Sequence, residues 1–394
     1  MARARAATLR EGDAATPASA PNKTTQVVPF TQASKPEIEP GPSWSELTLT
    51  ANSQELGSVT IPANGFIGAI LIDVETTTVG VEGTGEKTEN YPFNMFEQVR
   101  LTEPNGAPIG LELNGWQTML ANIYGGYAGM PDPRNDPDFS ETLIKPSFTL
   151  RLPIEISPNA LGILGNQSAA AAFRLTLKLA PSTSVYKKAL TTNPKFAVRT
   201  FIELWGEPPK EDIFGRTNKQ MPDYAGTAQY WSVQAALKVA KAQNTIKLTR
   251  VGSQIRTLIF EFLAAGLRAD TAAPDPFEIQ LDNRIFRQYS RRILRKLMRE
   301  QIESLSKRDV GIYAITFSKG EHRHAGENEI NSWLATLTAT RLELRGPAEA
   351  EGELNILTND ISVAPPNPSE RTPQINAGAW HPPLGAGNVT GNVG

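Results

Sequence analysis

The stretch from Phe96 to Tyr124 decides the fold and reads FEQVRLTEPNGAPIGLELNGWQTMLANIY. It opens as a strand, because Val99 and Leu101 alternate with polar neighbours. Pro104-Asn105-Gly106 follows, and an Asn-Gly pair accepts the positive φ angles of a tight hairpin. Apolar residues alternate again over 109–113, which indicates the returning strand. The first half of the stretch is therefore a β-hairpin.

The second half of the stretch has the pattern of a short helix. Asn114 has the chemistry of an N-cap, since its side chain can accept from the free backbone N–H groups of the first turn. The large apolar residues of the helix are spaced to share one side, namely Trp116, Met119, Leu120 and Ile123. We expect this side to pack on a sheet.

A similar order of elements returns later in the chain. Phe277–Leu281 reads FEIQL, the turn Asp282-Asn283 follows, and a longer helix is predicted from about Arg287 to Leu305. A segment rich in β-forming residues follows each helix, over 147–156 and over 311–318. One strand–turn–helix–strand unit thus occurs twice, about a domain's length apart, which predicts two similar β domains in tandem.

Many short alternating strands separated by turns are typical of all-β sandwiches. One helix in each sandwich narrows the prediction to two tandem eight-stranded jelly rolls, each with an inserted flanking helix. The expected division is an N-terminal arm at 1–42, a first jelly roll at 43–208, a linker at 209–227, a second jelly roll at 228–364 and a C-terminal tail at 365–394.

Composition excludes several classes of protein. The 394 residues suffice for two cores, and the 40% hydrophobic and 20% charged residues are ordinary for a globular chain. The net charge of −2 gives no general attraction to nucleic acid, so no direct nucleic-acid binding is expected. With no cysteine, thiolate catalysis, disulfides and cysteine-based zinc sites are absent.

The N-terminal arm contains Arg3, Arg5 and Arg10 but no apolar segment behind them, so it does not read as a secretory signal. Glu11 and Asp13 argue against a transit peptide, and no stretch approaches the ~20 apolar residues of a membrane span. We expect a protein made in the cytoplasm. The arm is either flexible or becomes ordered on a partner whose acidic groups meet the arginines.

The histidines carry the strongest metal-like pattern. His322, His324 and Glu329 have the HxH-x4-E spacing by which cupins, which are also jelly rolls, hold a metal. The surroundings are polar, Thr316 stands where the motif has glycine, and His381 lacks a second motif. We therefore expect an exposed loop and neither a metal nor another cofactor.

Two further patterns resemble known functional sites. Asp132, Asp136 and Asp138 carry calcium-type oxygen atoms, but Pro-Asp and Asn-Asp runs favour turns, and the glycine of an EF-hand loop is missing. Ser304 and Lys307 match SxxK without its companion motifs. Nothing in the sequence requires an enzyme.

A basic run in the second half of the chain suggests nucleic acid at first sight. Its members are Arg284, Arg287, Arg291, Arg292, Arg295, Lys296 and Arg299. Apolar residues recur in the same segment at spacings of three and four: Phe286, Tyr289, Ile293, Leu297 and Met298. This combination predicts a helix docked on its sandwich with a solvated or inter-subunit basic face. The candidate inter-subunit residues are Arg291, Arg292, Arg295 and Arg299, together with Trp380 of the tail.

With these features together, the chain resembles the double-jelly-roll major capsid proteins of tailless, membrane-containing icosahedral phages of the tectivirus type. Adenovirus hexon has a similar architecture. The resemblance covers about residues 44–363. It rests on Gly57–Gly65 leading into a buried strand, on Phe93–Leu101, on Glu103–Gly106, on Asn114-Gly115-Trp116 and on the basic helix and following strand of Arg291–Ile315.

The resemblance implies a virion protein that forms homotrimers. Two jelly rolls per chain and three chains per capsomer give a pseudo-hexagonal tile, which contacts neighbouring capsomers, penton and minor capsid proteins. In that family the N-terminal arm lies near an internal membrane, so Arg3, Arg5 and Arg10 would meet lipid phosphates or a minor protein. Removal of residues 1–40 is then expected to leave trimers intact and impair particle assembly.

Two other classes of protein stay open. A cupin-type metal-dependent enzyme requires His322, His324 and Glu329 to converge inside a barrel. A two-domain carbohydrate-binding protein requires exposed aromatic platforms. Most of the tryptophans lie within or beside predicted elements, where burial is the ordinary outcome: Trp116, Trp205, Trp231 and Trp333.

Overall fold

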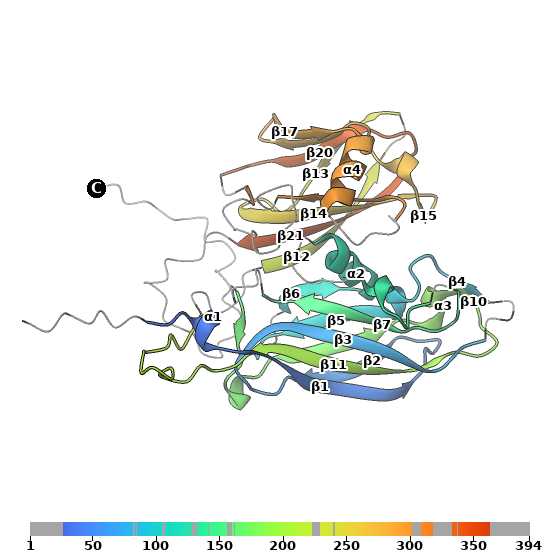
Figure 1. Cartoon of the computed structure of the whole chain (residues 1–394). Helices are drawn as coiled ribbons and strands as arrows, with labels where there is room; N and C mark the ends of the chain where they lie inside the picture. Colours follow the sequence, from blue (N-terminus) through green and yellow to red (C-terminus); the bar gives the residue numbers. More distant parts are fainter. Residues whose placement is uncertain are drawn as a thin grey trace, which may run out of the picture.

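The computed structural model describes residues 27–362, apart from 82, 84, 105, 107, 126, 128–131, 141, 156–159, 161, 223–228, 239–240, 302–308, 318–332 and 337. Two β units lie side by side, with one helix, α2, at their junction (Figure 1). The helices are α1 (Phe30–Ala33), α2 (Gly115–Tyr124), α3 (Ser182–Val185) and α4 (Arg291–Gln301), with short 3-10 turns η1 (Phe93–Met95), η2 (Pro133–Asn135), η3 (Ala169–Ala171) and η4 (Asp270–Ala272).

The first unit consists of two antiparallel sheets. One sheet has the order β1 (Pro36–Leu47), β11 (Lys195–Trp205), β3 (Phe66–Thr78) and β7 (Phe148–Pro153), with the short β8 (Leu164–Gly165) also on β3. The other has the order β2 (Gln54–Thr60), β9 (Arg174–Leu179), β5 (Phe96–Thr102) and β6 (Pro108–Leu113). A separate two-stranded ribbon pairs β4 (Glu86–Lys87) with β10 (Tyr186–Lys188).

The second unit repeats this arrangement. Its first sheet runs β12 (Gln229–Lys238), β21 (Gly352–Ser362) and β14 (Ser253–Ala264), and β14 also pairs with β18 (Ile312–Thr316), β15 (Leu267–Arg268) and β19 (Leu334–Ala335). Its second sheet runs β13 (Gln243–Lys247), β20 (Leu342–Pro347), β16 (Phe277–Leu281) and β17 (Arg284–Tyr289). Because the main strands follow the same order in both units, the predicted all-β double jelly roll is confirmed.

Alternating side chains explain the facing sheets. In β9, Leu175, Leu177 and Leu179 are fully buried, whereas the residues between them are partly exposed. Such a strand has one face in the core and one toward solvent. The buried residues of both jelly rolls form one continuous apolar cluster. The two units are therefore packed together as one body rather than joined only by a linker.

Strand β14 departs from alternation because both of its faces are covered. Phe260 and Phe262 contact the ring of Phe277 in the opposite sheet, so they face the core. Thr257 and Glu261 bond to residues of the first jelly roll instead. The near-continuous apolar run of the strand thus reflects its place between a core and a second domain.

Helix α2 begins at a capping box. The Asn114 side chain accepts from the backbone N–H of Gln117, and the Gln117 side chain accepts from the backbone N–H of Asn114. The prediction of one apolar side was incomplete, because every residue of α2 except Gln117 is buried. One side packs on β7 and β5, and the second jelly roll covers the other.

Helix α4 begins at Arg291, so the predicted start at Arg287 was wrong. The preceding residues form strand β17, which pairs with β16 through a two-residue turn. Asp282 and Asn283 have φ angles of 48° and 67° in that turn, as a tight hairpin needs. The predicted continuation to Leu305 lies outside the described residues.

The apolar side of α4 also differs from the expectation. Leu294 and Met298 are buried against the sheet, whereas Ile293 is 47% exposed. Phe286 is 44% exposed, because it lies on β17 and not on the helix. Met298 was on the predicted apolar side and Leu294 was not, so the buried side agrees with the prediction only in part.

The described part of the predicted arm belongs to the first jelly roll. Strand β1 begins at Pro36, seven positions before the expected boundary at 43, because it pairs with the full length of β11. The Phe30 ring of α1 packs edge-on against Phe66, with centroids 5.1 Å apart. Part of the predicted linker returns to this site, since the N–H of Val28 donates to the carbonyl of Thr217. None of the helices in the described ranges has the length and apolar character to span a membrane.

Candidate functional site

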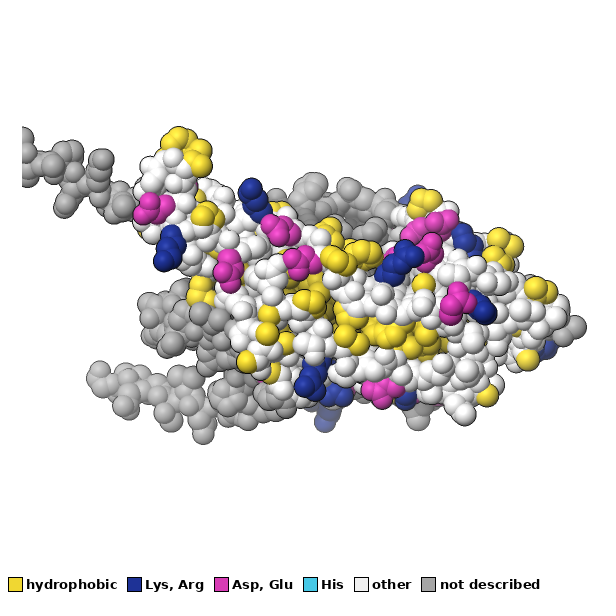
Figure 2. Space-filling view, turned by 90° about the horizontal axis from the view of Figure 1, so that it is seen from below, with side chains coloured by type: hydrophobic (Ala, Val, Ile, Leu, Met, Phe, Trp, Pro, Cys, Tyr) yellow, Lys and Arg dark blue, Asp and Glu magenta, His cyan; other side chains and the backbone are white. Residues whose placement is uncertain are grey.

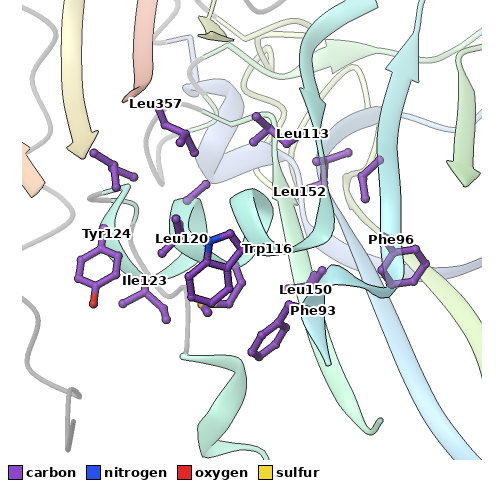
Figure 3. Close-up of a cluster of buried hydrophobic side chains, with 14 of the residues drawn as sticks. Phe93, Phe96, Leu113, Trp116, Leu120, Ile123, Tyr124, Leu150, Leu152 and Leu357 are labelled. Atoms are coloured by element: carbon purple, nitrogen blue, oxygen red, sulfur yellow. The ribbon is translucent and has the colours of Figure 1, made fainter. Parts of the chain in front are cut away.

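The most elaborate side-chain arrangement lies where the two jelly rolls meet, and we call it the seam. Trp116 of α2 donates its indole N–H to Glu261 Oε1 of β14 at 2.8 Å. The other carboxylate oxygen, Glu261 Oε2, accepts from the Asn355 amide at 3.0 Å. Leu357 of β21 lies in the same apolar cluster as Leu120 of α2 (Figure 3). The seam therefore combines apolar packing with a satisfied buried carboxylate.

A second contact of the seam is ionic. The Arg134 guanidinium bonds to Asp132 at 2.8 Å and to Asp309 of the second jelly roll at 2.9 Å. Tyr124 of α2 donates its hydroxyl to the same Asp309 carboxylate at 3.1 Å. Burial raises the pKa of the Tyr124 phenol, so it keeps its proton and its role as donor. A hollow of about 350 Å³ lies beside this group and is lined by Trp116, Arg134 and Asp309 among others.

A buried guanidinium completes the seam. Arg256 of β14 has no exposed surface, and its Cζ lies 3.7 Å from the centroid of the Tyr127 ring. The Tyr127 hydroxyl also bonds to Asn359 of β21 at 3.3 Å. Burial lowers the pKa of Arg256. A cation held against an aromatic face inside the protein is suited to fixing two domains relative to one another.

The predicted metal ligands His322, His324 and Glu329 lie outside the described residues, and so do Ser304 and Lys307. Within the described ranges, no group of three or more histidine or acidic side chains could hold a metal ion. Asp132 instead caps η2 and pairs with Arg134. Asp136 accepts from the backbone of Asp138. These aspartates make turns and ion pairs, in line with the turn interpretation.

The predicted inter-subunit residues fall into three groups. Arg291 is satisfied within its own chain by Asp275, Glu349 and the carbonyl of Asp270, so it anchors α4. Arg295 lies 3.6 Å from Asp270. Arg292 and Arg299 are exposed on α4, where a second molecule can reach them. Trp380, like Arg3, Arg5 and Arg10, lies outside the described residues.

The four tryptophans whose side chains the structure describes offer no broad aromatic platform. Trp116 and Trp333 are each 4% exposed. Trp44 and Trp205 are half-buried, and their indole N–H groups bond to the carbonyl of Leu56 and to Glu155. These side chains serve the protein's own packing, so a sugar-stacking surface built from them is not supported.

Sequence reasoning missed the seam residues Glu261, Asp309 and Tyr127. One signal was present, because Glu261 interrupts the apolar run of β14 with a single carboxylate. A lone charge in a strand that is otherwise buried on both faces indicates a partner from another element. The partner itself, Trp116, is not encoded in any local pattern.

The paired sheets, the repeated strand order and the helix after the last strand of each smaller sheet define the class of fold: this is the double jelly roll of viral major capsid proteins. The crystal structure of the STIV major capsid protein matches with a TM-score of 0.57 at 11% identity, over 86% of this chain and 99% of that one. The major capsid protein P2 from bacteriophage PM2 matches with a TM-score of 0.50 at 11% identity, over 84% and 99%.

The PBCV-1 virus capsid gives a further match, with a TM-score of 0.51 at 14% identity over 84% of this chain and 95% of that one. No family model matches the chain, and no curated protein matches it in sequence. Since these identities are low, the structural matches define the fold and its extent. The matches cover 84–86% of this chain, so they extend over both jelly rolls.

Proposed function

We propose that the protein is a viral major capsid protein that forms trimeric, pseudo-hexagonal capsomers and has no catalytic role. The observation that carries the proposal is the rigid pairing of two equivalent jelly rolls through α2. The structural match extends over 99% of the chain of the STIV major capsid protein and 99% of the chain of the PM2 protein P2. A binding module or a single-domain enzyme has no need of two equivalent units fixed to one another.

The capsomer follows from this pairing. A chain with two equivalent units that associates as a trimer places six similar units around one axis, and such a tile packs with its neighbours as a hexagon does. The interface between chains is expected to bury more than about 2,000 Å², as permanent interfaces do. The partners on this proposal are two further copies of the chain, neighbouring capsomers, and penton and minor capsid proteins. The protein would act in the virion after synthesis in the host cytoplasm.

An internal membrane beneath the shell is the finer part of the proposal. At the end of the molecule where residue 27 enters, the loop of residues 209–217 exposes Ile213 and Phe214 by 93% and 76%. The Arg216 guanidinium lies 5.5 Å from the Phe214 ring. Apolar and aromatic tips beside basic side chains are favourable at a lipid–water interface. This loop and Arg3, Arg5 and Arg10 would face the same bilayer.

Solution mass tests the proposal. Light scattering is expected to give three times the chain mass of 42.8 kDa, and negative-stain images of the same peak a hexagonal outline. A monodisperse monomer at high concentration would contradict the capsomer. A monomer that also carries a stoichiometric transition metal would favour the cupin-type alternative and its residues His322 and His324.

A further inference from the structure

The repeat of the two jelly rolls allows helix α2 to be compared with α4 position by position. Each helix follows the last strand of the smaller sheet, β6 or β17. Asn114 caps α2 by accepting from the N–H of Gln117, and Ser290 likewise accepts from the N–H of Ile293 in α4. In both helices the donor is the third residue after the cap. The caps therefore align the two helices.

A second contact confirms this alignment independently. Asn122, eight positions after the cap of α2, bonds to the backbone N–H of Arg151 in β7. Met298, eight positions after the cap of α4, accepts from the backbone N–H of Ala314 in β18. The two helices therefore sit on their own jelly rolls in the same register, and Arg151 corresponds to Ala314.

The outward sides of the two helices differ in chemistry. In α2 this side carries Trp116, Leu120 and Ile123, which are buried, and Trp116 bonds to Glu261 of the second jelly roll (Figure 3). The corresponding positions of α4 are Arg292, Lys296 and Arg299, which are exposed. A permanent contact within one chain can be apolar. A contact that forms between chains after folding is better served by charged side chains, which keep the free chain soluble.

The same alignment identifies the surface that corresponds to the Trp116 partner. In the second jelly roll, Ala314 and Ile312 pair with Ile259 and Glu261 of β14. In the first jelly roll, Arg151 and Thr149 pair with Leu71 and Asp73 of β3. Asp73 therefore occupies the position of Glu261. It accepts from the Thr149 hydroxyl at 3.0 Å and is partly exposed on the outer face of the sheet β1-β11-β3-β7.

Apolar positions correspond as well. Leu357, which lies in the same buried cluster as α2, is opposite Ile259. Phe201 lies opposite Leu71 in the same way and is partly exposed on the outer face. Ile38 of β1, on the same face, is 64% exposed. The side of the molecule where β1 lies, seen from below in Figure 2, carries a band of apolar side chains among charged ones. This face resembles the seam but has no second jelly roll on it.

We propose that α4 of one copy lies on the outer face of sheet β1-β11-β3-β7 of a second copy, with Arg292 against Asp73, as Trp116 lies against Glu261 within the chain. This deepens the proposed function and rests on it. Both pairs place an N–H donor on a carboxylate, and the guanidinium adds charge to the bond. The contact is head-to-tail, so successive copies form a ring when the rotation between them closes.

Charge complementarity favours a second copy over nucleic acid as the occupant of α4. Arg292, Lys296 and Arg299 would meet a face that contains Asp73, Glu75 and Glu203. Glu75 and Glu203 pair with Arg199 and Arg151 on that face. Asp73 accepts from the Thr149 hydroxyl and is the carboxylate that the alignment places opposite Arg292. With a net charge of −2, the chain has no general field that would draw α4 to phosphates.

A charge swap tests the pair. Arg292→Asp and Asp73→Arg are each expected to weaken trimer association at least about a hundredfold, because each variant puts like charges together. The double variant is expected to recover most of the association. Asp73→Asn keeps an acceptor for Thr149 and is expected to weaken the trimer, but less than Asp73→Arg, because it removes a charge without adding a repulsive one. Lys188→Glu, on the exposed ribbon strand β10, is the matched control and should leave the mass unchanged.

Cross-linking separates this interface from others. The chain has no cysteine, so Arg292→Cys and Asp73→Cys each introduce a single thiol. A short bismaleimide should join the two variants when they are mixed during assembly, and neither variant to itself. Cross-linking of either variant alone would show a different, self-complementary contact. If wild-type trimers form while the swap and the cross-link both fail, the interface is wrong and the capsid function stands. If the wild type stays monomeric, the proposed function itself fails.

Discussion

The indole N–H of Trp116 and the carboxylate of Glu261 form a buried 2.8 Å hydrogen bond between residues 145 positions apart, one in each jelly roll. The Asn355 amide donates to the other carboxylate oxygen, so each oxygen of the buried Glu261 carboxylate accepts a hydrogen bond. A buried ion needs such partners to be tolerated. This bond, with the apolar packing around α2, fixes the two units as one rigid building block.

Loss of the Trp116 indole donor should therefore lower the free energy of unfolding by more than loss of an indole that donates to a neutral carbonyl. Trp116→Phe is expected to lower the free energy of unfolding by about 2 kcal/mol, because a hydrogen bond to a charged group is removed. Trp44→Phe is the matched control, since its indole donates to the neutral carbonyl of Leu56, and it should cost about 1 kcal/mol. Chemical denaturation at fixed protein concentration measures both. Equal losses in the two variants would contradict the special role of the seam bond.

The N-cap residue of α2, Asn114, is expected to stabilise the folded chain. Asn114→Ala removes the acceptor for the N–H of Gln117 and should lower stability by about 1 kcal/mol. Asn114→Asp keeps the acceptor and should stay within a few tenths of a kcal/mol of the wild type. Thermal melts of the two variants decide the point. A full loss in the aspartate variant would mean that the cap is not the source of the effect.

The half-buried carboxyl of Glu155 should make stability depend on pH. Burial raises the pKa of Glu155 above its usual 4.5, although the N–H of Ala160 and the indole of Trp205 donate to it. The folded state thus holds the proton more tightly than the unfolded chain, and this contribution is lost as pH rises through the raised pKa. Relative to Glu155→Gln, the wild type should become less stable from pH 4.5 upward. A stability difference that does not change with pH would contradict this.

A truncation that tests the N-terminal segment should end at residue 26 and not at residue 40, because residues from 27 onward belong to the first jelly roll. Removing 1–40 would delete Phe30, which packs on Phe66, and the start of β1. Removal of 1–26 is instead expected to leave trimers intact and to reduce the yield of closed particles. The triple variant Arg3→Ala, Arg5→Ala, Arg10→Ala should reproduce the loss if charge is responsible. Normal particle yield from the truncated chain would remove any assembly role from this segment.

The proposed contact of the exposed residues Ile213 and Phe214 with a membrane can be tested with lipid vesicles. Ile213→Ser with Phe214→Ser should reduce flotation of the protein with vesicles containing anionic lipid and leave the trimer mass unchanged. Leu267→Ser is the control, because Leu267 is also about half-exposed but lies on the short strand β15 of the second jelly roll. Equal flotation of wild type and tip variant would argue that the loop faces another protein.

Much of the fold was encoded locally. The alternation of β9 and the Asp282-Asn283 turn predicted their structures, and the Asn114 cap marked the start of α2 correctly. The helix α4 was misplaced because the arginines of β17 continue into it, and charge hides the change from strand to helix. Local pattern decides such elements only where apolar periodicity is clean.

The contacts of the seam could not be predicted from local sequence patterns. Its contacts join residues far apart in the chain, and the pairing of Trp116 with Glu261 depends on how two finished jelly rolls meet. The sequence indicated only that β14 is unusually apolar and that α2 is rich in large side chains. Both features are consistent with ordinary core packing, so only the three-dimensional arrangement separates core from interface.

The most direct test of the central claim is a cryo-electron microscopy map of the assembled particle of this protein. We expect six jelly rolls around one axis, with α4 of each chain on the sheet β1-β11-β3-β7 of the next and Arg292 beside Asp73. Two chains related by a self-complementary contact, or isolated chains with α4 facing solvent, would contradict the claim.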